Sequence, residues 1–154
     1  MALEKSLWQR LHKTAVPNLV EQGHRVDLRR LENVCEKGTP DVEGCIDAKQ
    51  VWIELKSCNR PKRAKTPCHP KIRQEQIDWL KTRAAAGCRT CWLLIQVGEA
   101  HNARLYLIPG PHAAQAQDVP EHELDLLGVA NPELSPAALL LVAARGWRGV
   151  GDNG

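Results

Sequence analysis

The seven-residue run CWLLIQV at residues 91–97 restricts the fold more than any other segment of this chain. Six of its seven residues are apolar, so a strand formed here belongs in the centre of a sheet, covered on both faces. A second apolar run, ARLYLIP, follows it, and VWIELKS precedes it with the β-branched and aromatic start that is typical of strands. The sequence therefore predicts a β-sheet with a buried central strand.

Helical periodicity appears in three other segments. Near the N-terminus, apolar residues recur at helical spacing until Pro17, which we expect to end the helix: Leu3, Leu7, Trp8 and Leu11. A second helix is predicted from Ile72 to Ala84, with Gly87 in the left-handed conformation that often follows a helix. A third is predicted from Pro136 to Arg145, followed by a frayed tail, RGWRGVGDNG. The order of these elements predicts an α/β fold, a mixed central β-sheet flanked by helices.

Two strands of this sheet are predicted to form a hairpin. After a turn at residues 38–40, the segment DVEGCID alternates in polarity like a half-buried strand. A turn near residues 47–50 then joins it to VWIELKS. We also predict an extended segment within residues 24–34. Residues 57–70 are predicted to form an exposed irregular loop, because three prolines interrupt them.

The composition is that of one ordinary globular domain, with 154 residues of which 43% are hydrophobic and 25% charged. We expect a core at residues 1–110 and an acidic, Ala- and Pro-rich extension at residues 111–154 that packs on it. No apolar run approaches the roughly 20 residues that cross a bilayer, and MALEKSLWQR lacks the apolar stretch of a secretory signal. These features predict a protein of the cytoplasm without a membrane partner.

Six cysteines are present, and without a signal for secretion we expect them to be free thiols. Cys88 and Cys91 have the CxxC spacing of a zinc knuckle, and Cys68 and His69 lie upstream, so a structural zinc site is the alternative. Cys91 also opens the apolar run at residues 91–97, where a small thiol packs well in a core. This second interpretation is the one we favour.

Basic residues are concentrated in the first two thirds of the chain. Residues 1–104 contain 19 Lys and Arg against 12 Asp and Glu, whereas residues 105–154 contain 2 against 6. No acidic residue interrupts the segment between Glu54 and Glu75, which carries these cations: Lys56, Arg60, Lys62, Arg63, Lys65, Lys71 and Arg73. Such a segment is typical of a surface that binds a polyphosphate, although a solvated loop has the same composition.

The predicted strand VWIELKS carries two charged residues on one face. Because strand side chains alternate, Glu54 and Lys56 point one way while Leu55 points into the core. In the predicted hairpin Asp41 comes close to Glu54, so two carboxylates converge beside one lysine. Adjacent carboxylates repel each other unless one is protonated or a cation lies between them, and hard oxygen ligands favour Mg²⁺ or Mn²⁺.

This arrangement suits phosphodiester hydrolysis. A divalent ion holds a phosphate oxygen, lowers the pKa of a bound water and offsets the charge that develops on the phosphate. A lysine has an ordinary pKa of about 10.4, which nearby carboxylates raise further. We therefore predict an electrostatic role for Lys56 rather than that of general base.

Pro40-Asp41, followed thirteen residues after the aspartate by Glu54-Leu55-Lys56, resembles the motif of the PD-(D/E)xK nuclease superfamily. GTPDVEG, VWIELK and a helix with Gln76 before Trp79 are similar to the VRR-NUC branch, which includes small stand-alone nucleases of phages and bacteria. The resemblance covers about residues 24–97. It implies a restriction-endonuclease-like core, Mg²⁺ or Mn²⁺ as cofactor without an organic one, and a junction-resolvase-like homodimer that acts on branched DNA such as four-way junctions.

The resemblance also implies roles for individual residues. Asp41 and Glu54 match the metal ligands, the backbone carbonyl of Leu55 is a further ligand, and Lys56 matches the catalytic lysine. Gln76 matches a helix position that faces the site. Its helix face also carries apolar residues, which predicts partial burial of the amide, with a surface amide as the alternative: Ile72, Trp79 and Leu80.

Two further assignments depend on the same resemblance. A glutamate from the first helix usually completes such a metal site, and both Glu4, on the predicted helix, and Glu32, in RRLENV, are candidates. The candidate DNA-binding residues are Arg29, Arg30, Arg60, Lys62, Arg63, Lys65, Lys71 and Arg73.

The sequence thus predicts a Mg²⁺- or Mn²⁺-dependent DNA endonuclease that acts on branched or structured DNA. The alternative is a DNA-binding module without catalytic activity. That module uses the basic loop at residues 56–73, and its acidic residues form structural ion pairs.

Overall fold

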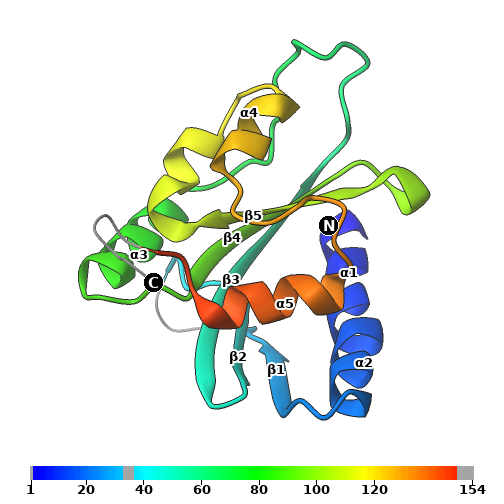
Figure 1. The fold of residues 1–154 in the computed structure, drawn as a ribbon. Coiled ribbons are helices and arrows are strands. Elements are labelled where there is room, and N and C mark those ends of the chain that lie inside the picture. The colour runs from blue at the N-terminus through cyan, green and yellow to red at the C-terminus, as the bar shows by residue number, and fades with distance from the viewer. Residues whose placement is uncertain (1, 33–36, 149–154) are drawn as a thin grey trace.

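The computed structural model describes residues 2–32 and 37–148 (Figure 1). Its centre is one mixed sheet with the strand order β1-β2-β3-β4-β5, in which neighbours are antiparallel except β3 and β4. The strands are β1 (Val26–Arg30), β2 (Val42–Ile46), β3 (Lys49–Cys58), β4 (Cys91–Val97) and β5 (Arg104–Pro109). Helices cover both faces, so the predicted α/β fold with a mixed sheet flanked by helices is confirmed.

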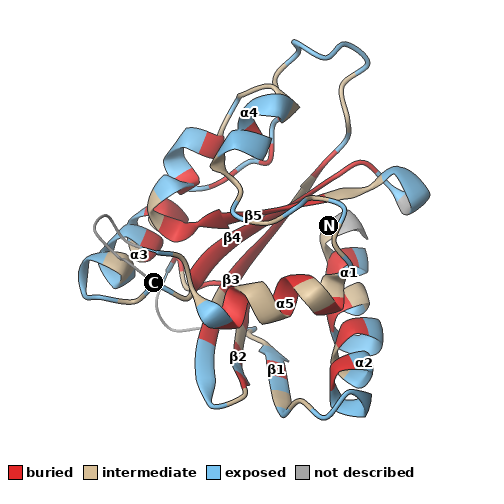
Figure 2. Ribbon diagram, viewed as in Figure 1, coloured by how far each residue is buried: buried red, intermediate tan, exposed pale blue. Residues whose placement is uncertain are grey.

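β4 is the central apolar strand that the run CWLLIQV predicts. All seven of its residues are buried, and it lies between β3 and β5 (Figure 2). Leu94 belongs to the hydrophobic core on one face of the sheet, whereas Leu93 and Ile95 belong to the core on the other face. One strand therefore contributes to both cores, which requires apolar side chains on both of its faces.

The N-terminal and C-terminal helices share one face of the sheet, and the helices between them cover the other (Figure 1). The first face packs against α1 (Ala2–Gln9), the π-helical segment η1 (Arg10–Ala15), α2 (Val16–Glu21) and α5 (Pro136–Arg145). The second packs against α3 (Gln74–Ala85), the 3₁₀ segment η3 (Gly110–Ala116) and α4 (Glu121–Leu127). A short 3₁₀ turn, η2 (Ala100–Asn102), joins β4 to β5.

Two of the predicted helices are confirmed. α3 is the crossover that the parallel pairing of β3 and β4 requires, and Gly87 follows it with a φ of +108°. α5 has the predicted bounds, and the side chain of Ser135 caps its N-terminus by accepting a hydrogen bond from the N–H of Ala138.

The predicted hairpin is formed by β2 and β3. Asp47 and Ala48 make its turn with positive φ angles of 48° and 72°. The register pairs Ile46 with Lys49 and Val42 with Ile53. Val42, Gly44 and Ile46 are buried, as predicted for a half-buried strand. This register places Asp41, just before β2, next to Glu54.

The N-terminal helix does not end at Pro17, contrary to the prediction. The helical stretch continues through α2 to Glu21, with Pro17 in the first turn of α2, where a missing N–H is tolerated. In the preceding π-helical segment, the N–H of Val16 donates to the carbonyl of Leu11, five residues back. This change in hydrogen bonding accommodates the proline within a continuous helical stretch.

The loop after β3 is shorter and better anchored than its prolines predict. β3 extends to Cys58 because its pairing with β4 continues as far as Val97. Cys68 and Pro70 are buried, and the N–H of Cys68 donates to the carbonyl of Val119. The predicted exposed loop at residues 57–70 is therefore correct only for its middle part.

The C-terminal third contains more structure than the one predicted helix, since η3 and α4 also form. Trp147, in the segment predicted to fray, packs edge-on against Trp92 with 5.1 Å between ring centroids, so that prediction is wrong for this residue. Residues 149–154 of the tail lie outside the described part of the chain. The predicted extended segment at residues 24–34 contains β1, and its last two residues are likewise not described.

The predicted packing of the C-terminal extension, the absence of a membrane helix and the state of the cysteines can each be compared with the structure. In the extension, Leu139 and Leu140 of α5 lie in the same hydrophobic core as Leu55 of β3. In the described ranges, no helix has the length and apolar character needed to cross a bilayer. The five cysteines in those ranges are free thiols, and Cys35 lies outside them.

Gly38 has surroundings that only glycine tolerates. Its φ is +86°, and a Cβ there would lie 2.1 Å from the backbone oxygen of Glu75, whereas a Cβ on Gly87 would meet nothing within 4 Å. We expect Gly87→Ala to cost about 1–2 kcal/mol of stability for its left-handed backbone. Gly38→Ala should cost about 1–3 kcal/mol more, because α3 has to move. Urea unfolding measures both losses, and equal losses would contradict this packing argument.

Candidate metal and active site

β3 carries Glu54, Leu55 and Lys56 with the predicted alternation. Leu55 lies in the core that α1 and α5 cover, whereas the Glu54 side chain reaches α3 on the opposite face. Only 1% of Glu54 and 8% of Lys56 is exposed. A carboxylate and an ammonium group are thus held in a largely buried position, where electrostatic interactions are stronger than in water.

Asp41 lies where the pairing of β2 with β3 ends. Val42 and Ile53 are the last pair, and beyond them Asp41 Oδ2 accepts a hydrogen bond of 2.9 Å from the N–H of Leu55. The N–H and the carbonyl of a strand residue point to the same side. The carbonyl of Leu55 therefore faces the same edge of β3 as Asp41, as a shared ligand site requires.

Gln76 fixes the position of Glu54. Its side-chain oxygen accepts the N–H of Arg73 at 3.0 Å, in a capping box at the start of α3. Its amide nitrogen is therefore the atom that donates to Glu54 Oε1, at 2.9 Å. Only 4% of Gln76 is exposed, so the alternative of a helix-surface amide is wrong.

Glu54 is the residue of this site whose ionisation is most unfavourable. Its Oε2 is buried and has no hydrogen-bond partner among the described residues. Burial raises the pKa of Glu54 to about 9, with a further contribution from Asp41, while Lys56 opposes the shift. The pair of carboxylates therefore needs either a shared proton or a cation.

The structure brings Glu4, and not Glu32, toward this site. Glu4 lies in the first turn of α1, and its charge adds to the raised pKa of Glu54. It also lines a hollow of about 570 Å³ that contains Ser57 and Lys71. Glu32 is exposed beyond the end of β1, and β2 lies between β1 and β3.

The donor set at Glu54 fits a hard divalent cation. Asp41 and Glu54 supply carboxylate oxygens, the Leu55 carbonyl faces the same edge, and Glu54 Oε2 is free of a hydrogen bond within the described structure. In residues 2–32 and 37–148, no three His, Cys, Asp or Glu side chains form a metal-binding group. The fit therefore depends on two carboxylates and one backbone carbonyl, all oxygen ligands of the kind that Mg²⁺ and Mn²⁺ prefer.

In the described structure Cys68, His69, Cys88 and Cys91 likewise do not gather into the group of ligands that a zinc site needs. His69 pairs with Asp118. The thiol of Cys91 is buried against the carbonyl of Leu80, at 3.8 Å, as expected for a core cysteine.

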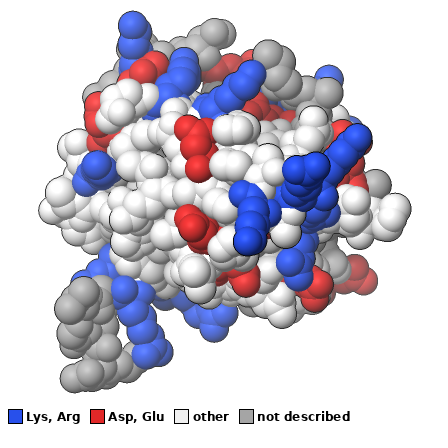
Figure 3. Space-filling model, turned by 90° about the horizontal axis from the view of Figure 1, so that it is seen from above, with Lys and Arg blue, Asp and Glu red and all other residues white. Residues whose placement is uncertain are grey.

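The basic side chains differ in how free they are to bind a phosphate. Lys62, Arg63 and Lys65 are exposed on the loop after β3, and the described residues offer them no ion pair. Arg29 and Arg73 pair with neighbouring carboxylates, those of Asp27 and Glu75. Lys and Arg form several separate groups on the face in Figure 3, with Asp and Glu between them.

Arg60 has a structural role that the sequence does not reveal. Its guanidinium donates to both carboxylate oxygens of Glu121, at 2.7 and 3.1 Å, and to the carbonyl of Asn102 at 2.7 Å. Tyr106 donates its hydroxyl to Glu121 at 2.6 Å. Burial would raise the pKa of Glu121, but these hydrogen bonds outweigh it and hold the pKa below its usual value. α4 thereby fixes the start of the basic loop, and Glu121 neutralises the charge of Arg60.

Comparison with known proteins gives a structural likeness only. No family model and no curated protein matches the chain. Among solved structures, the chain is similar to Hjc, a Holliday junction resolvase from the archaeal hyperthermophile Archaeoglobus fulgidus. The TM-score is 0.49 and the identity 16%, over 85% of this chain and 98% of that one. A likeness at this level assigns neither family nor activity, so membership of the PD-(D/E)xK superfamily and its VRR-NUC branch stays a prediction.

The raised pKa of Glu54 predicts a pH-dependent stability of the metal-free protein. The folded state keeps a proton that the unfolded state releases above its ordinary pKa of 4.5. Stability is therefore fully present below that pH, and falls by up to about 1.4 kcal/mol per pH unit as pH rises toward about 9. Glu54→Gln should remove this slope in urea unfolding with EDTA, whereas the exposed control Glu123→Gln should retain it. An unchanged slope in Glu54→Gln would contradict the assignment.

The ion pair of Arg60 with Glu121 predicts how the loop is held. In Glu121→Ala the partly buried guanidinium loses its carboxylate partner, so the loop should open more often. We expect trypsin to cut after Lys62, Arg63 or Lys65 about tenfold faster, which corresponds to about 1.4 kcal/mol. The matched control is Glu133→Ala, which removes the more exposed partner of Arg104. Equal cleavage rates in the two variants would contradict this role.

Proposed function

We propose that this chain is a divalent-metal-dependent endodeoxyribonuclease that hydrolyses phosphodiester bonds. The observation that carries the proposal is the pair of Asp41 and Glu54 beside Lys56, with one buried Glu54 oxygen left without a hydrogen bond in the described structure. Burial next to a second carboxylate opposes ionisation of Glu54, and a divalent cation bound by both groups removes that penalty. A lysine on the same strand face adds positive charge where a phosphate would bind.

Each residue of the site has a distinct role in this proposal. Asp41, Glu54 and the Leu55 carbonyl hold Mg²⁺ or Mn²⁺, which when bound polarises a phosphate and lowers the pKa of a water molecule. Gln76 keeps Glu54 in one orientation through its 2.9 Å hydrogen bond. Lys56 supplies a positive charge that stabilises the negative charge developing on the phosphate oxygens. Glu4 is an additional carboxylate next to this centre.

The loop after β3 provides the DNA-binding surface in the proposal. Lys62, Arg63 and Lys65 are exposed there, and Lys71 lines the same hollow as Glu4. Positive charge thus extends from the exposed loop toward the carboxylates, which attracts a phosphate backbone. Following the family resemblance, we further propose branched DNA such as a four-way junction as the preferred substrate and a homodimer as the active form.

The second candidate function is DNA binding without cleavage, which the exposed cations of the loop support by themselves. In that case Asp41 and Glu54 share a proton and have only a structural role. Calorimetric titration with Mn²⁺ separates the two functions. A protein that binds DNA with strong salt dependence but binds no Mn²⁺ would favour the second function.

We expect the wild-type protein to cleave at least one DNA in a panel of four-way junctions, flaps and linear duplexes when the buffer contains Mg²⁺ or Mn²⁺. Asp41→Asn and Lys56→Ala should each lower the cleavage rate by about 100-fold or more, because they remove a ligand or a charge that acts on the transition state. DNA binding in Ca²⁺ should change little. The exposed controls Asp27→Asn and Lys81→Ala should cleave normally, and intact DNA across the whole panel would refute the proposal.

The same assay tests the placement of the glutamates. Glu4→Gln should slow cleavage by roughly tenfold, since the charge of Glu4 acts on Glu54. Glu32→Gln should have no effect. The reverse order would show that α1 does not supply the additional carboxylate.

A further inference from the structure

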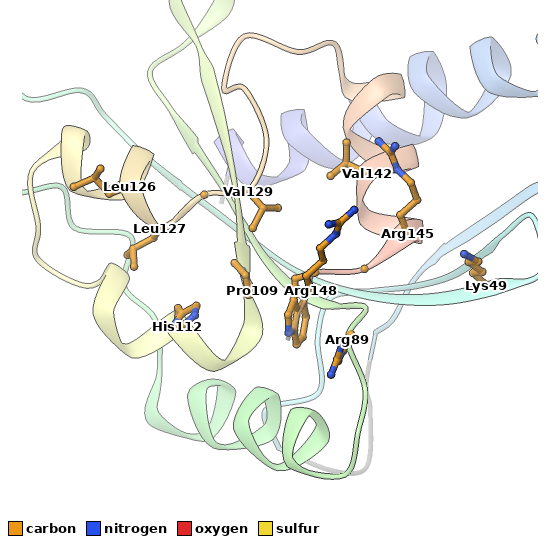
Figure 4. A pocket seen from close by; sticks show the side chains of 13 residues that line it. Lys49, Arg89, Pro109, His112, Leu126, Leu127, Val129, Val142, Arg145 and Arg148 are labelled. Carbon is orange, nitrogen blue, oxygen red and sulfur yellow. The ribbon is translucent and has the colours of Figure 1, made fainter. Parts of the chain in front are cut away.

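A second hollow lies away from the candidate active site, between α4 and α5 beside the end of β5 (Figure 4). Its volume is about 1060 Å³, at the upper end of the range for small-molecule pockets. It includes Lys49, the first residue of β3, which precedes Glu54 by five residues and so lies about 17 Å from it along the strand. None of Asp41, Glu54, Lys56 and Gln76 lines the hollow, which is therefore separate from the candidate active site.

The charges around this hollow are all of one sign. Residues 105–154 contain only two basic residues, Arg145 and Arg148, and both line it together with Lys49, Arg89 and His112. The six acidic residues of the same segment outnumber them, yet none of the described Asp or Glu residues lines the hollow. Figure 4 shows Arg148 beside Arg145, across from the side chains of α4 and η3. An acidic segment of the chain thus forms a cationic pocket.

The remaining lining is apolar and partly open to solvent. Leu126 is 81% exposed and Val129 46%, and they are two of the three large hydrophobic side chains that are exposed in the described ranges. Leu127, Val142 and Trp147 continue this apolar lining. Exposed apolar area next to cations favours a ligand that has both an anionic group and a flat apolar body.

We propose that this pocket binds a nucleotide, either free or as an unpaired unit of a DNA strand. Arg145 and Arg148 present paired donors to the phosphate, which guanidinium groups recognise better than ammonium groups do. The base lies against the apolar wall formed by Leu127, Val142 and Trp147, where base contacts with apolar and aromatic side chains stabilise binding. Binding here uses neither Asp41 nor Lys56, so the site does not depend on the proposed nuclease activity.

The test measures binding in EDTA, so that cleavage cannot interfere. The probes are a fluorescein-labelled strand of eight thymidines, with unlabelled dTMP as competitor, followed by fluorescence anisotropy. The double variant R145Q/R148Q should bind the strand at least about tenfold more weakly, and its salt dependence should fall because two phosphate contacts are lost. The control K13Q/K81Q changes net charge equally at exposed positions and should bind within about twofold of wild type.

A second variant guards against misfolding of the double variant. Val129→Asp places a carboxylate in the pocket at a half-exposed side chain, and it should weaken strand binding while the melting temperature stays near that of wild type. If dTMP competes with the strand for the wild type, the site binds free nucleotides. If dTMP does not compete, while R145Q/R148Q and Val129→Asp bind the strand more weakly, the site binds nucleotides within a strand.

Three results would overturn the proposal. The first is an equal loss of affinity in R145Q/R148Q and K13Q/K81Q, which would mean that net charge alone matters. The second is unchanged strand binding in Val129→Asp. The third is a polyglutamate peptide that binds the wild type as tightly as the DNA strand does and is weakened equally by R145Q/R148Q, which would show an acidic peptide site instead.

Discussion

The burial of the Glu54 carboxylate beside Asp41 is the constraint on which the site depends. A buried carboxylate is stable only with hydrogen bonds or a positive charge, and in the described structure Glu54 accepts a hydrogen bond from Gln76 and has Lys56 on its own strand. β2 begins only at Val42, so Asp41 can reach the edge of β3, and the capping box of α3 holds Gln76 over Glu54. Three elements thus keep like charges together at a cost in stability that a bound cation would offset.

The parts of this site that depend on local periodicity could be predicted from the sequence. Alternation along β3 gives the shared face of Glu54 and Lys56, and the polarity of DVEGCID gives the register that brings in Asp41. The burial of Gln76 follows from the apolar residues on the same face of α3. Each of these inferences needs only neighbouring residues or a hairpin of short loop length, and the central position of β4 follows equally from its apolar run.

The parts that the sequence left open or did not reveal depend on contacts between distant segments. The choice between Glu4 and Glu32 requires the position of α1 relative to β3, which no local pattern specifies. The bond between Arg60 and Glu121 joins residues 61 positions apart, so Arg60 looks like one more free cation in the sequence. Gly98 leaves room for this guanidinium, since a Cβ there would lie 2.9 Å from Arg60 Nη1. Pro17 misled for a different reason, because a proline ends a helix only if its missing N–H is needed.

The acidic C-terminal third is better understood by where its charges lie than by their sum. Glu121 faces the basic loop and neutralises Arg60, whereas Lys62, Arg63 and Lys65 lie exposed further along that loop. Arg145 and Arg148 lie at the end of α5, in a hollow without a described carboxylate. The same segment also supplies Leu139 and Ala143 to the core beneath Leu55. Any change that loosens α5 therefore acts on β3, which carries Glu54 and Lys56, and on the cationic pocket together.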